Sequence, residues 1–243
     1  MSLDFSGLVN VGGNLNIQYL NNPSYVSHNL SFPLLETIGG NFYVYYYYGE
    51  NLIAPSLTTV GGYLQLYYCN YLTDIRLPAL QTIGSYLQLY NLYQLSSINF
   101  QSLLTIGDSL QFSSLSQLSS INFQSLLTIG DYFSMSSSSA LDVLEFPVLD
   151  TVGSDFSVSS SGTSTGRISL PLLTQINGDL TLSSTTYPTF DAPMLERVVE
   201  DLYVSNSYNL VDFNVPKLSE VATSSSNSYG RKKPRASLSR SHL

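Results

Sequence analysis

The sequence predicts an all-β fold in which about ten coils of roughly 23 residues stack into a parallel β-helix or leucine-rich-repeat-like solenoid. Three observations predict this fold. One motif recurs with a period of about 23 residues, apolar and polar residues alternate within each period, and Pro or Gly recurs at fixed places between the alternations. With 43% hydrophobic and only 11% charged residues, the chain can build a long core but not a charge-rich helical protein.

The repeat is clearest where it is identical. Residues 95–108 read LSSINFQSLLTIGD, and residues 118–131 repeat that string without change. The wider consensus is Leu/Phe-Pro-x-Leu-x-Thr-Ile/Val-Gly-x-x-Leu/Phe-x-Leu/Val. Its Ile/Val position falls at Val11, Ile38, Val60, Ile83, Ile106, Ile129, Val152, Ile176, Val198 and Val221. These positions predict one solenoid domain over residues 1–222, in which each coil buries its apolar face against its neighbours.

Each coil should contain two or three short strands. The first is predicted where apolar and polar residues alternate, as in Leu64-Gln65-Leu66, and the second about nine residues later, as in Ile75-Arg76-Leu77. Because successive side chains on a strand point to opposite faces, the apolar residues of the first strand should point inward. These residues are Leu15, Ile17, Phe42, Val44, Leu64, Leu66, Leu87, Leu89, Leu110, Phe112, Phe133, Met135, Phe156, Val158, Leu180, Leu182, Leu202 and Val204.

The glycine of the Thr-Ile-Gly step is expected at a corner between strands. There it would provide a positive φ or permit close approach between coils. The glycines at this step are Gly12, Gly39, Gly61, Gly84, Gly107, Gly130 and Gly153. With coils about 4.8 Å apart, ten of them would form a rod roughly 45 Å long.

The strings from Phe32 to Val44 and from Leu77 to Leu89 resemble the receptor L-domain type of leucine-rich solenoid. That fold occurs in the ectodomains of insulin- and EGF-type receptors and in fungal cell-wall-organisation proteins held by GPI anchors. A second candidate is the BspA-like class of surface leucine-rich repeats, which has a similar period and a similar Ile-Gly step. The resemblance implies a non-catalytic surface recognition module.

Charge argues against a nucleic-acid partner for the solenoid. All 17 acidic residues but only four basic ones precede residue 222, so this part of the chain carries a formal charge of −13. Such a surface repels phosphate backbones. No apolar run approaches the roughly 18 residues of a membrane helix, so no membrane span is predicted in this chain.

Few residues could support catalysis, a metal or a cofactor. His28 and His242 are the only histidines, and Cys69, the only cysteine, is expected to be a small core residue. Five aspartates recur near the corner and either form a calcium-binding row or, as we favour, cap the corners: Asp108, Asp131, Asp155, Asp179 and Asp201. The protein is therefore predicted not to be an enzyme and to need no cofactor or metal.

The outward positions of the first strand suggest a binding surface. They are Tyr and Gln in the N-terminal half of the rod and almost all Ser and Thr in the C-terminal half. Exposed Tyr offers rigid contact area with a polar tip, and low charge suits a protein or glycan ligand. The predicted ligand-binding residues are Tyr43, Tyr45, Gln65, Tyr67, Gln88 and Tyr90. The alternative is that these ladders only stabilise a parallel sheet.

Both ends of the chain bear on its location. Residues 223–243 are Ser-rich and basic and are predicted to be a disordered tail, with or without a targeting function for the basic run 231–235. At the other end, either a signal peptide and cap precede this sequence, or Met1 is the true start. The first case predicts cell-surface or extracellular recognition or adhesion. The second predicts a cytoplasmic structural scaffold that uses the same face.

Overall fold

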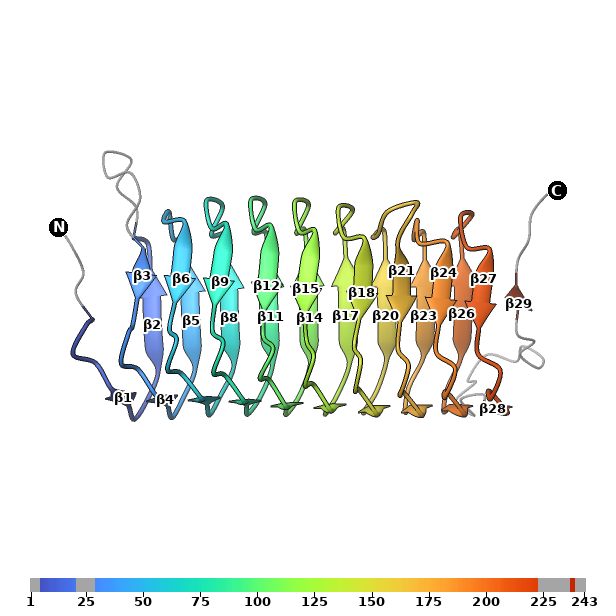
Figure 1. Cartoon of the computed structure of the whole chain (residues 1–243), viewed down its shortest axis with the longest axis horizontal. Helices are drawn as coiled ribbons and strands as arrows, with labels where there is room; N and C mark the ends of the chain where they lie inside the picture. Colours follow the sequence, from blue (N-terminus) through green and yellow to red (C-terminus); the bar gives the residue numbers. More distant parts are fainter. Residues whose placement is uncertain (1–4, 21–28, 223–236, 239–243) are drawn as a thin grey trace, which may run out of the picture.

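The computed structural model describes residues 5–20, 29–222 and 237–238. The described residues form strands, turns and bends without any helix, and the coils follow one another along a straight rod (Figure 1). Each of nine complete coils contributes one strand to each of three faces. All described strand pairs are parallel. From β1 to β28 the partners are about 23 residues apart, as in Leu87 with Leu64 and Leu110. The predicted all-β solenoid is confirmed.

The first sheet runs along one narrow edge of the rod, at the bottom of Figure 1, and is built from the Thr-Ile steps. Its ten strands are β1 (Asn10–Val11), β4 (Thr37–Ile38), β7 (Thr59–Val60), β10 (Thr82–Ile83), β13 (Thr105–Ile106), β16 (Thr128–Ile129), β19 (Thr151–Val152), β22 (Gln175–Ile176), β25 (Arg197–Val198) and β28 (Glu220–Val221). In each of the eight strands from β4 to β25 the Ile or Val is buried, so the motif position that defines the repeat is a core position.

The second sheet contains the alternating strands. These are β2 (Leu15–Gln18), β5 (Phe42–Tyr45), β8 (Leu64–Tyr67), β11 (Leu87–Tyr90), β14 (Leu110–Ser113), β17 (Phe133–Ser136), β20 (Phe156–Ser159), β23 (Leu180–Ser183), β26 (Leu202–Ser205) and β29 (Ser237–Leu238). All eighteen residues predicted to point inward belong to the core or pack against it. Leu15, Leu202 and Val204 are only partly buried, because they lie in the first and ninth coils.

The third face is divided into two sheets. One contains β3 (Leu30–Ser31), β6 (Asn51–Ile53), β9 (Asp74–Arg76), β12 (Ser97–Asn99) and β15 (Ser120–Asn122), and the other β18 (Val143–Glu145), β21 (Arg167–Ser169), β24 (Thr189–Asp191) and β27 (Asp212–Asn214). This face overlaps the second sheet in Figure 1. Rings that directly follow its strands pack against rings of the second sheet. The Phe133 and Phe146 centroids are 5.3 Å apart, and those of Phe32 and Phe42 are 6.0 Å apart. The core therefore lies inside the coils, enclosed by these two faces and the first sheet.

The coil count is in line with the predicted number of about ten. The tenth Thr-Ile-type step forms β28, but the described residues of the repeat region end at residue 222 without a further alternating strand. The tenth place in the second sheet is taken by β29, which pairs with β26. The rest of the predicted disordered tail, including the basic run 231–235, lies outside the described residues.

The Thr-Ile-Gly glycines are needed for close approach between coils. A Cβ added at Gly39 would lie 2.5 Å from the carbonyl oxygen of Gly12, and the later glycines of this step meet the preceding coil in the same way. The alternative that these glycines adopt positive φ is wrong, since Gly162 is the one described glycine that does. The backbone crowding of stacked coils, not the turn itself, excludes a side chain here.

Positive φ is found instead at the opposite corner, directly after each strand of the second sheet. The residues there are Tyr19, Tyr46, Tyr68, Asn91, Ser114, Ser137, Ser160, Ser184 and Asn206, with φ between 47° and 58°. Asn tolerates this left-handed conformation well, whereas a Tyr in it is uncommon. We call these nine residues the left-handed row.

The residue after each left-handed position points into the core. In the N-terminal half it is a large side chain or a thiol, at Leu20, Tyr47, Cys69, Leu92 and Leu115, and in the C-terminal half it is a small hydroxyl-bearing one, at Ser138, Ser161, Thr185 and Ser207. The buried hydroxyls bond to backbone, as when Ser161 Oγ donates to the Ser159 carbonyl at 2.8 Å. The expectation that Cys69 is a core residue is confirmed, because its side chain is fully buried.

Candidate functional site

The six residues predicted to bind a ligand lie together on three adjacent strands of the second sheet. We call Tyr43, Tyr45, Gln65, Tyr67, Gln88 and Tyr90 the tyrosine–glutamine face. They occupy the outward positions of β5, β8 and β11, and each is half-buried. The strand register forms two rows, one running from Tyr43 through Gln65 to Gln88 and the other from Tyr45 through Tyr67 to Tyr90.

The tyrosine row is a stack of rings. The centroids of Tyr45 and Tyr67 are 5.7 Å apart and their planes are 10° from parallel, so each ring covers a face of the other. Tyr90 ends the row at 6.0 Å from Tyr67, with its plane tilted by 58°. On the next coil Ser113 follows Tyr90 in register. The stack therefore presents ring edges and hydroxyls outward, and it stops abruptly between β11 and β14.

The glutamine row is a chain of amide hydrogen bonds. Gln65 Nε2 donates to Gln88 Oε1, and Gln88 Nε2 donates to Gln111 Oε1 at 3.0 Å. Gln111 Nε2 then donates to Ser109 Oγ at 2.7 Å. The first two bonds join neighbouring coils, and the third joins two residues of one coil. These bonds support the interpretation that the outward Gln residues stabilise the parallel sheet. Each amide has a second N–H that these bonds do not use.

Sequence analysis missed the left-handed tyrosines that widen this surface. The ring of Tyr46 stacks on Tyr68 with centroids 5.1 Å apart and planes 17° from parallel, and it also contacts Tyr45 at 4.5 Å. Tyr19 stacks on Tyr46 at 5.7 Å. A signal existed, because these residues occupy one repeat position, immediately after the outward residue of the strand. The missing element was the backbone conformation, which turns this position outward.

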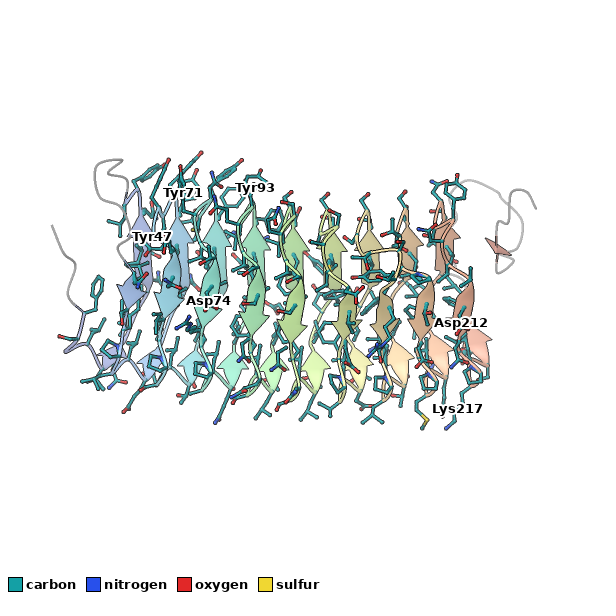
Figure 2. All side chains as sticks on the ribbon, turned by 45° about the horizontal axis from the view of Figure 1, so that its top comes forward. Tyr47, Tyr71, Asp74, Tyr93, Asp212 and Lys217 are labelled. Carbon is teal, nitrogen blue, oxygen red and sulfur yellow. The ribbon has the colours of Figure 1, made fainter. Side chains whose placement is uncertain are left out.

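Further tyrosines flank the surface. Tyr63 and Tyr86 stack at 4.6 Å with planes 6° from parallel, one residue before β8 and β11. Tyr71 and Tyr93 are 48% and 44% exposed, in the loops that lead to the third face. Figure 2 shows both projecting from the loop edge of the N-terminal coils, where ring-bearing side chains gather. The aromatic surface thus continues from the sheet around its corner.

The tyrosine–glutamine face is uncharged at neutral pH. Burial and the neighbouring phenols Tyr19 and Tyr46 raise the pKa of Tyr45 to about 12. Burial also raises the pKa of Tyr43, and hydrogen bonding with Tyr68 raises that of Tyr67. The phenols of Tyr43, Tyr45 and Tyr67 are therefore protonated at neutral pH, and their hydroxyls remain able to donate hydrogen bonds.

The C-terminal half of the second sheet is a surface of small hydroxyls. Ser136 Oγ donates to Ser113 Oγ at 3.0 Å, and Ser205 Oγ donates to Ser183 Oγ at 3.2 Å. The change from Tyr to Ser occurs at three positions between the same two coils, from Tyr86, Tyr90 and Tyr93 to Ser109, Ser113 and Ser116. The inward residue at the corner changes from Leu115 to Ser138, one coil after the outward change from Tyr90 to Ser113.

The five corner aspartates do not form a single row. Asp108 and Asp131 lie two residues before a second-sheet strand, whereas Asp155, Asp179 and Asp201 lie one residue before. Asp155 Oδ1 accepts the N–H of Asp179 at 2.8 Å, and Asp179 Oδ1 accepts that of Asp201 at 2.7 Å. This confirms the corner-capping interpretation for these two. Asp155, Asp179 and Glu200 have carboxylate oxygens within 4.8 Å of one another, but two of the three already serve as caps.

Cys69 is the free cysteine of the described residues, and it is buried. Burial raises the pKa of the Cys69 thiol to about 12, so it carries no thiolate at neutral pH. His28 and His242 lie outside the described residues.

The fold and the surface together define a leucine-rich β-solenoid with a neutral aromatic side. Six copies of the BspA type leucine rich repeat match residues 36–157, which is half of the chain. The chain therefore belongs to the BspA-type leucine-rich repeat family, the second of the two resemblances. The receptor L-domain resemblance stays a prediction. No curated protein and no solved structure matches the chain.

Family membership bears on function at a coarse level. BspA-type leucine-rich repeats are typical of surface proteins that bind other proteins, and such solenoids are generally non-catalytic. Among the described residues no helix is long and apolar enough to cross a membrane. The absence of nucleic-acid binding by the solenoid stays a prediction.

Proposed function

We propose that this protein is a non-catalytic recognition or adhesion module that binds a protein partner through the tyrosine–glutamine face. The observation that carries the proposal is the concentration of stacked, half-exposed phenols on one end of one sheet. Tyr is enriched in binding hot spots because it offers a large rigid contact area with a polar tip. A family of surface repeats that bind proteins is consistent with this role.

The ring geometry favours a protein over a glycan. Binding a sugar by stacking needs a free aromatic face, but Tyr45 and Tyr67 cover each other at an interplanar angle of 10°. Tyr46 and Tyr68 do the same at 17°. The groups left outward are ring edges, hydroxyls and the unused amide N–H groups of Gln65 and Gln88, which suit the polar and backbone groups of a protein surface.

The test is a protein array and a glycan array probed with the wild-type protein and with the triple variant Tyr45/Tyr67/Tyr90→Ser. Truncating a hot-spot Tyr typically costs about 2 kcal/mol or more, near thirtyfold in affinity. We expect the triple variant to lose protein ligands that the wild type binds. Thr59/Thr82/Thr105→Ser, on the first sheet of nearby coils, is the matched control and should lose none.

Far-UV circular dichroism verifies that both triple variants are folded. If the folded tyrosine variant retains every interaction of the wild type, the face is only a stabilising ladder and the proposal is wrong. If the interactions lost are with glycans alone, the face is a binding site but its ligand class is not the proposed one.

The proposed setting is the cell surface or the extracellular space, as is typical of the family. The alternative setting is the cytoplasm, where the same face would serve a scaffold. Mapping the 5′ end of the transcript separates the two, because an upstream in-frame signal peptide supports the first and an authentic start at Met1 supports the second.

A further inference from the structure

The outward side of the second sheet carries no charged residue on any of its nine repeat strands. The outward pairs are Asn16 and Gln18, Tyr43 and Tyr45, Gln65 and Tyr67, Gln88 and Tyr90, Gln111 and Ser113, Ser134 and Ser136, Ser157 and Ser159, Thr181 and Ser183, and Tyr203 and Ser205. The ion pairs lie elsewhere: Arg76 with Asp74 at 2.5 Å and Arg167 with Glu145 at 3.9 Å are on the third face. Figure 2 shows Asp74 and Asp212 on that face.

Side-chain size along this sheet is distributed about its middle strand, β14. Large residues occupy β5, β8 and β11, and small ones occupy β17, β20 and β23, at equal distances on either side. At the two end strands the order is reversed: the N-terminal strand β2 has no outward Tyr, whereas the C-terminal strand β26 has Tyr203. The left-handed row also runs from large to small residues, from Tyr19, Tyr46 and Tyr68 to Ser160, Ser184 and Asn206, but its ends are not reversed.

From this distribution we infer that the partner of the second sheet is a second copy of the chain, packed face to face with its rod antiparallel and with the two-fold axis along β14. This inference rests on the proposed function and names the partner of the same face. An isologous dimer brings one patch against itself, so the patch must be self-complementary. A size gradient becomes self-complementary when the two copies run in opposite directions.

The two-fold axis places each tyrosine of the outward pairs opposite a smaller residue. Tyr67 on β8 faces Ser159 on β20 of the other copy, because both strands lie two places from β14. By the same rule Tyr45 faces Ser183, and Tyr90 faces Ser136. At the ends Tyr203 faces Asn16. The summed side-chain volume between the sheets stays nearly constant along the rod, as two aligned sheets about 10 Å apart require.

The area is sufficient for a stable dimer. Nine coils about 4.8 Å apart and five residues about 3.3 Å apart, counting the left-handed row, span about 700 Å² per copy. The total of about 1,400 Å² lies within the range of specific protein interfaces. The equal spacing of coils in the two copies keeps opposing rows in register over the whole length, which a peptide or glycan lying along the rod cannot do.

Charge is compatible with this arrangement and predicts its salt dependence. The solenoid part of the chain carries a formal charge of −13, all of it outside the nine outward pairs of the second sheet. Two copies therefore repel each other at long range, but the contact itself buries no charge. Since about 0.15 M salt screens charges beyond roughly 8 Å, added salt should tighten the dimer.

The experiment is sedimentation velocity of the full chain over a concentration series. The wild type should show a reversible monomer–dimer equilibrium. Ser159→Tyr opposes Tyr67 with a second ring, and Tyr67→Ser leaves a gap opposite Ser159, each at two symmetric places. We expect either change to raise the dimer Kd about tenfold or more. The double variant exchanges the two sizes and should return the Kd to within about threefold of the wild type.

Two further variants complete the design. Thr128→Tyr on the first sheet is the matched control and should leave the Kd unchanged, because this exposed residue lies off the interface. Ser113→Asp places two carboxylates together at the axis and should abolish the dimer at neutral pH. It keeps the test decisive if Ser159→Tyr fails to fold, as judged by circular dichroism. A monomer at all concentrations up to about 1 mM, or a folded double variant without recovery, overturns the inference.

The same variants separate this inference from the proposed function. A monomeric wild type that still loses protein-array ligands in Tyr45/Tyr67/Tyr90→Ser keeps the proposed function and overturns the dimer. A dimer with recovery in the double variant supports both. A monomer whose array ligands are untouched by the triple variant overturns both.

Discussion

The buried hydroxyl of Ser161 accepts a hydrogen bond from the backbone N–H of Ser138 on the preceding coil, at an N···O distance of 3.2 Å. The same hydroxyl donates to the carbonyl of Ser159 at 2.8 Å. Ser161 thus satisfies two backbone groups at the corner of the C-terminal half, where Leu92 and Leu115 fill the corresponding position of earlier coils.

Ser161→Ala should destabilise the solenoid by about 1–3 kcal/mol, because it leaves the buried N–H of Ser138 without its acceptor. Ser164→Ala, at an exposed position of the same loop, should change stability by less than about 0.5 kcal/mol. Urea unfolding followed by circular dichroism measures both. Equal effects of the two substitutions would contradict the assigned role of the Ser161 hydroxyl.

Gly107→Ala should lower stability by about 1–3 kcal/mol, because the added Cβ meets the backbone of Gly84 on the preceding coil. Gly12 occupies the same motif position in the first coil, where an added Cβ meets no described atom within 4 Å. Gly12→Ala should therefore be nearly neutral. Thermal unfolding of the two variants is the measurement, and a Gly12→Ala variant as unstable as Gly107→Ala would show that close approach is not the reason for these glycines.

Stability should decline as the pH rises from about 10 to 12, partly through Tyr47. Burial raises the pKa of Tyr47 from 10.0 to about 12. The folded state therefore holds the phenol proton more tightly than the unfolded state, so this stabilisation is complete below pH 10 and is lost as pH approaches 12.

The phenol of Tyr47 accepts the N–H of Leu30 at 2.9 Å, so Tyr47→Phe should cost stability at neutral pH but flatten the loss between pH 10 and 12. Denaturant unfolding at a series of pH values checks this. An unchanged slope would mean that Tyr47 does not titrate differently in the two states.

Cys69 should be inert in the native protein. Its side chain is fully buried, its Sγ lies 3.7 Å from the carbonyl oxygens of Val44 and Tyr67, and burial raises its thiol pKa to about 12. An aromatic disulfide reagent should therefore modify no thiol in buffer and one thiol per chain in denaturant. Rapid native labelling would contradict the burial of this residue.

Much of the fold was predictable because the same sequence motif forms the same strands and the same core positions in every coil of a solenoid. The repeated Ile/Val of the Thr-Ile-Gly step and the period-two strands around Leu64 and Leu87 identify core positions without knowledge of distant contacts. The described residues contain nine complete coils and the first strand of a tenth, β28, in line with the predicted number of about ten.

The candidate site was predicted only in part. The outward positions of β5, β8 and β11 follow from alternation, so all six residues of the tyrosine–glutamine face were found. Tyr46 and Tyr68 were not, because their outward direction depends on a left-handed backbone that a Tyr rarely adopts. The division of the aspartates into two rows was also missed, although the sequence contains the one-residue shift: Asp131 directly follows Gly130, whereas Asp155 comes two residues after Gly153.

The sequence by itself determined the solenoid, its period, the inward residues and the gradient from Tyr to Ser, since each depends on spacing along the chain. Only the tertiary structure decided which corner is left-handed, why glycine stands at the other, and that the tyrosines stack ring on ring. The physical reason is that these features depend on distances between neighbouring coils, where a Gly39 Cβ would meet Gly12 and where Tyr45 meets Tyr67. Such distances arise only once residues about 23 positions apart are brought side by side.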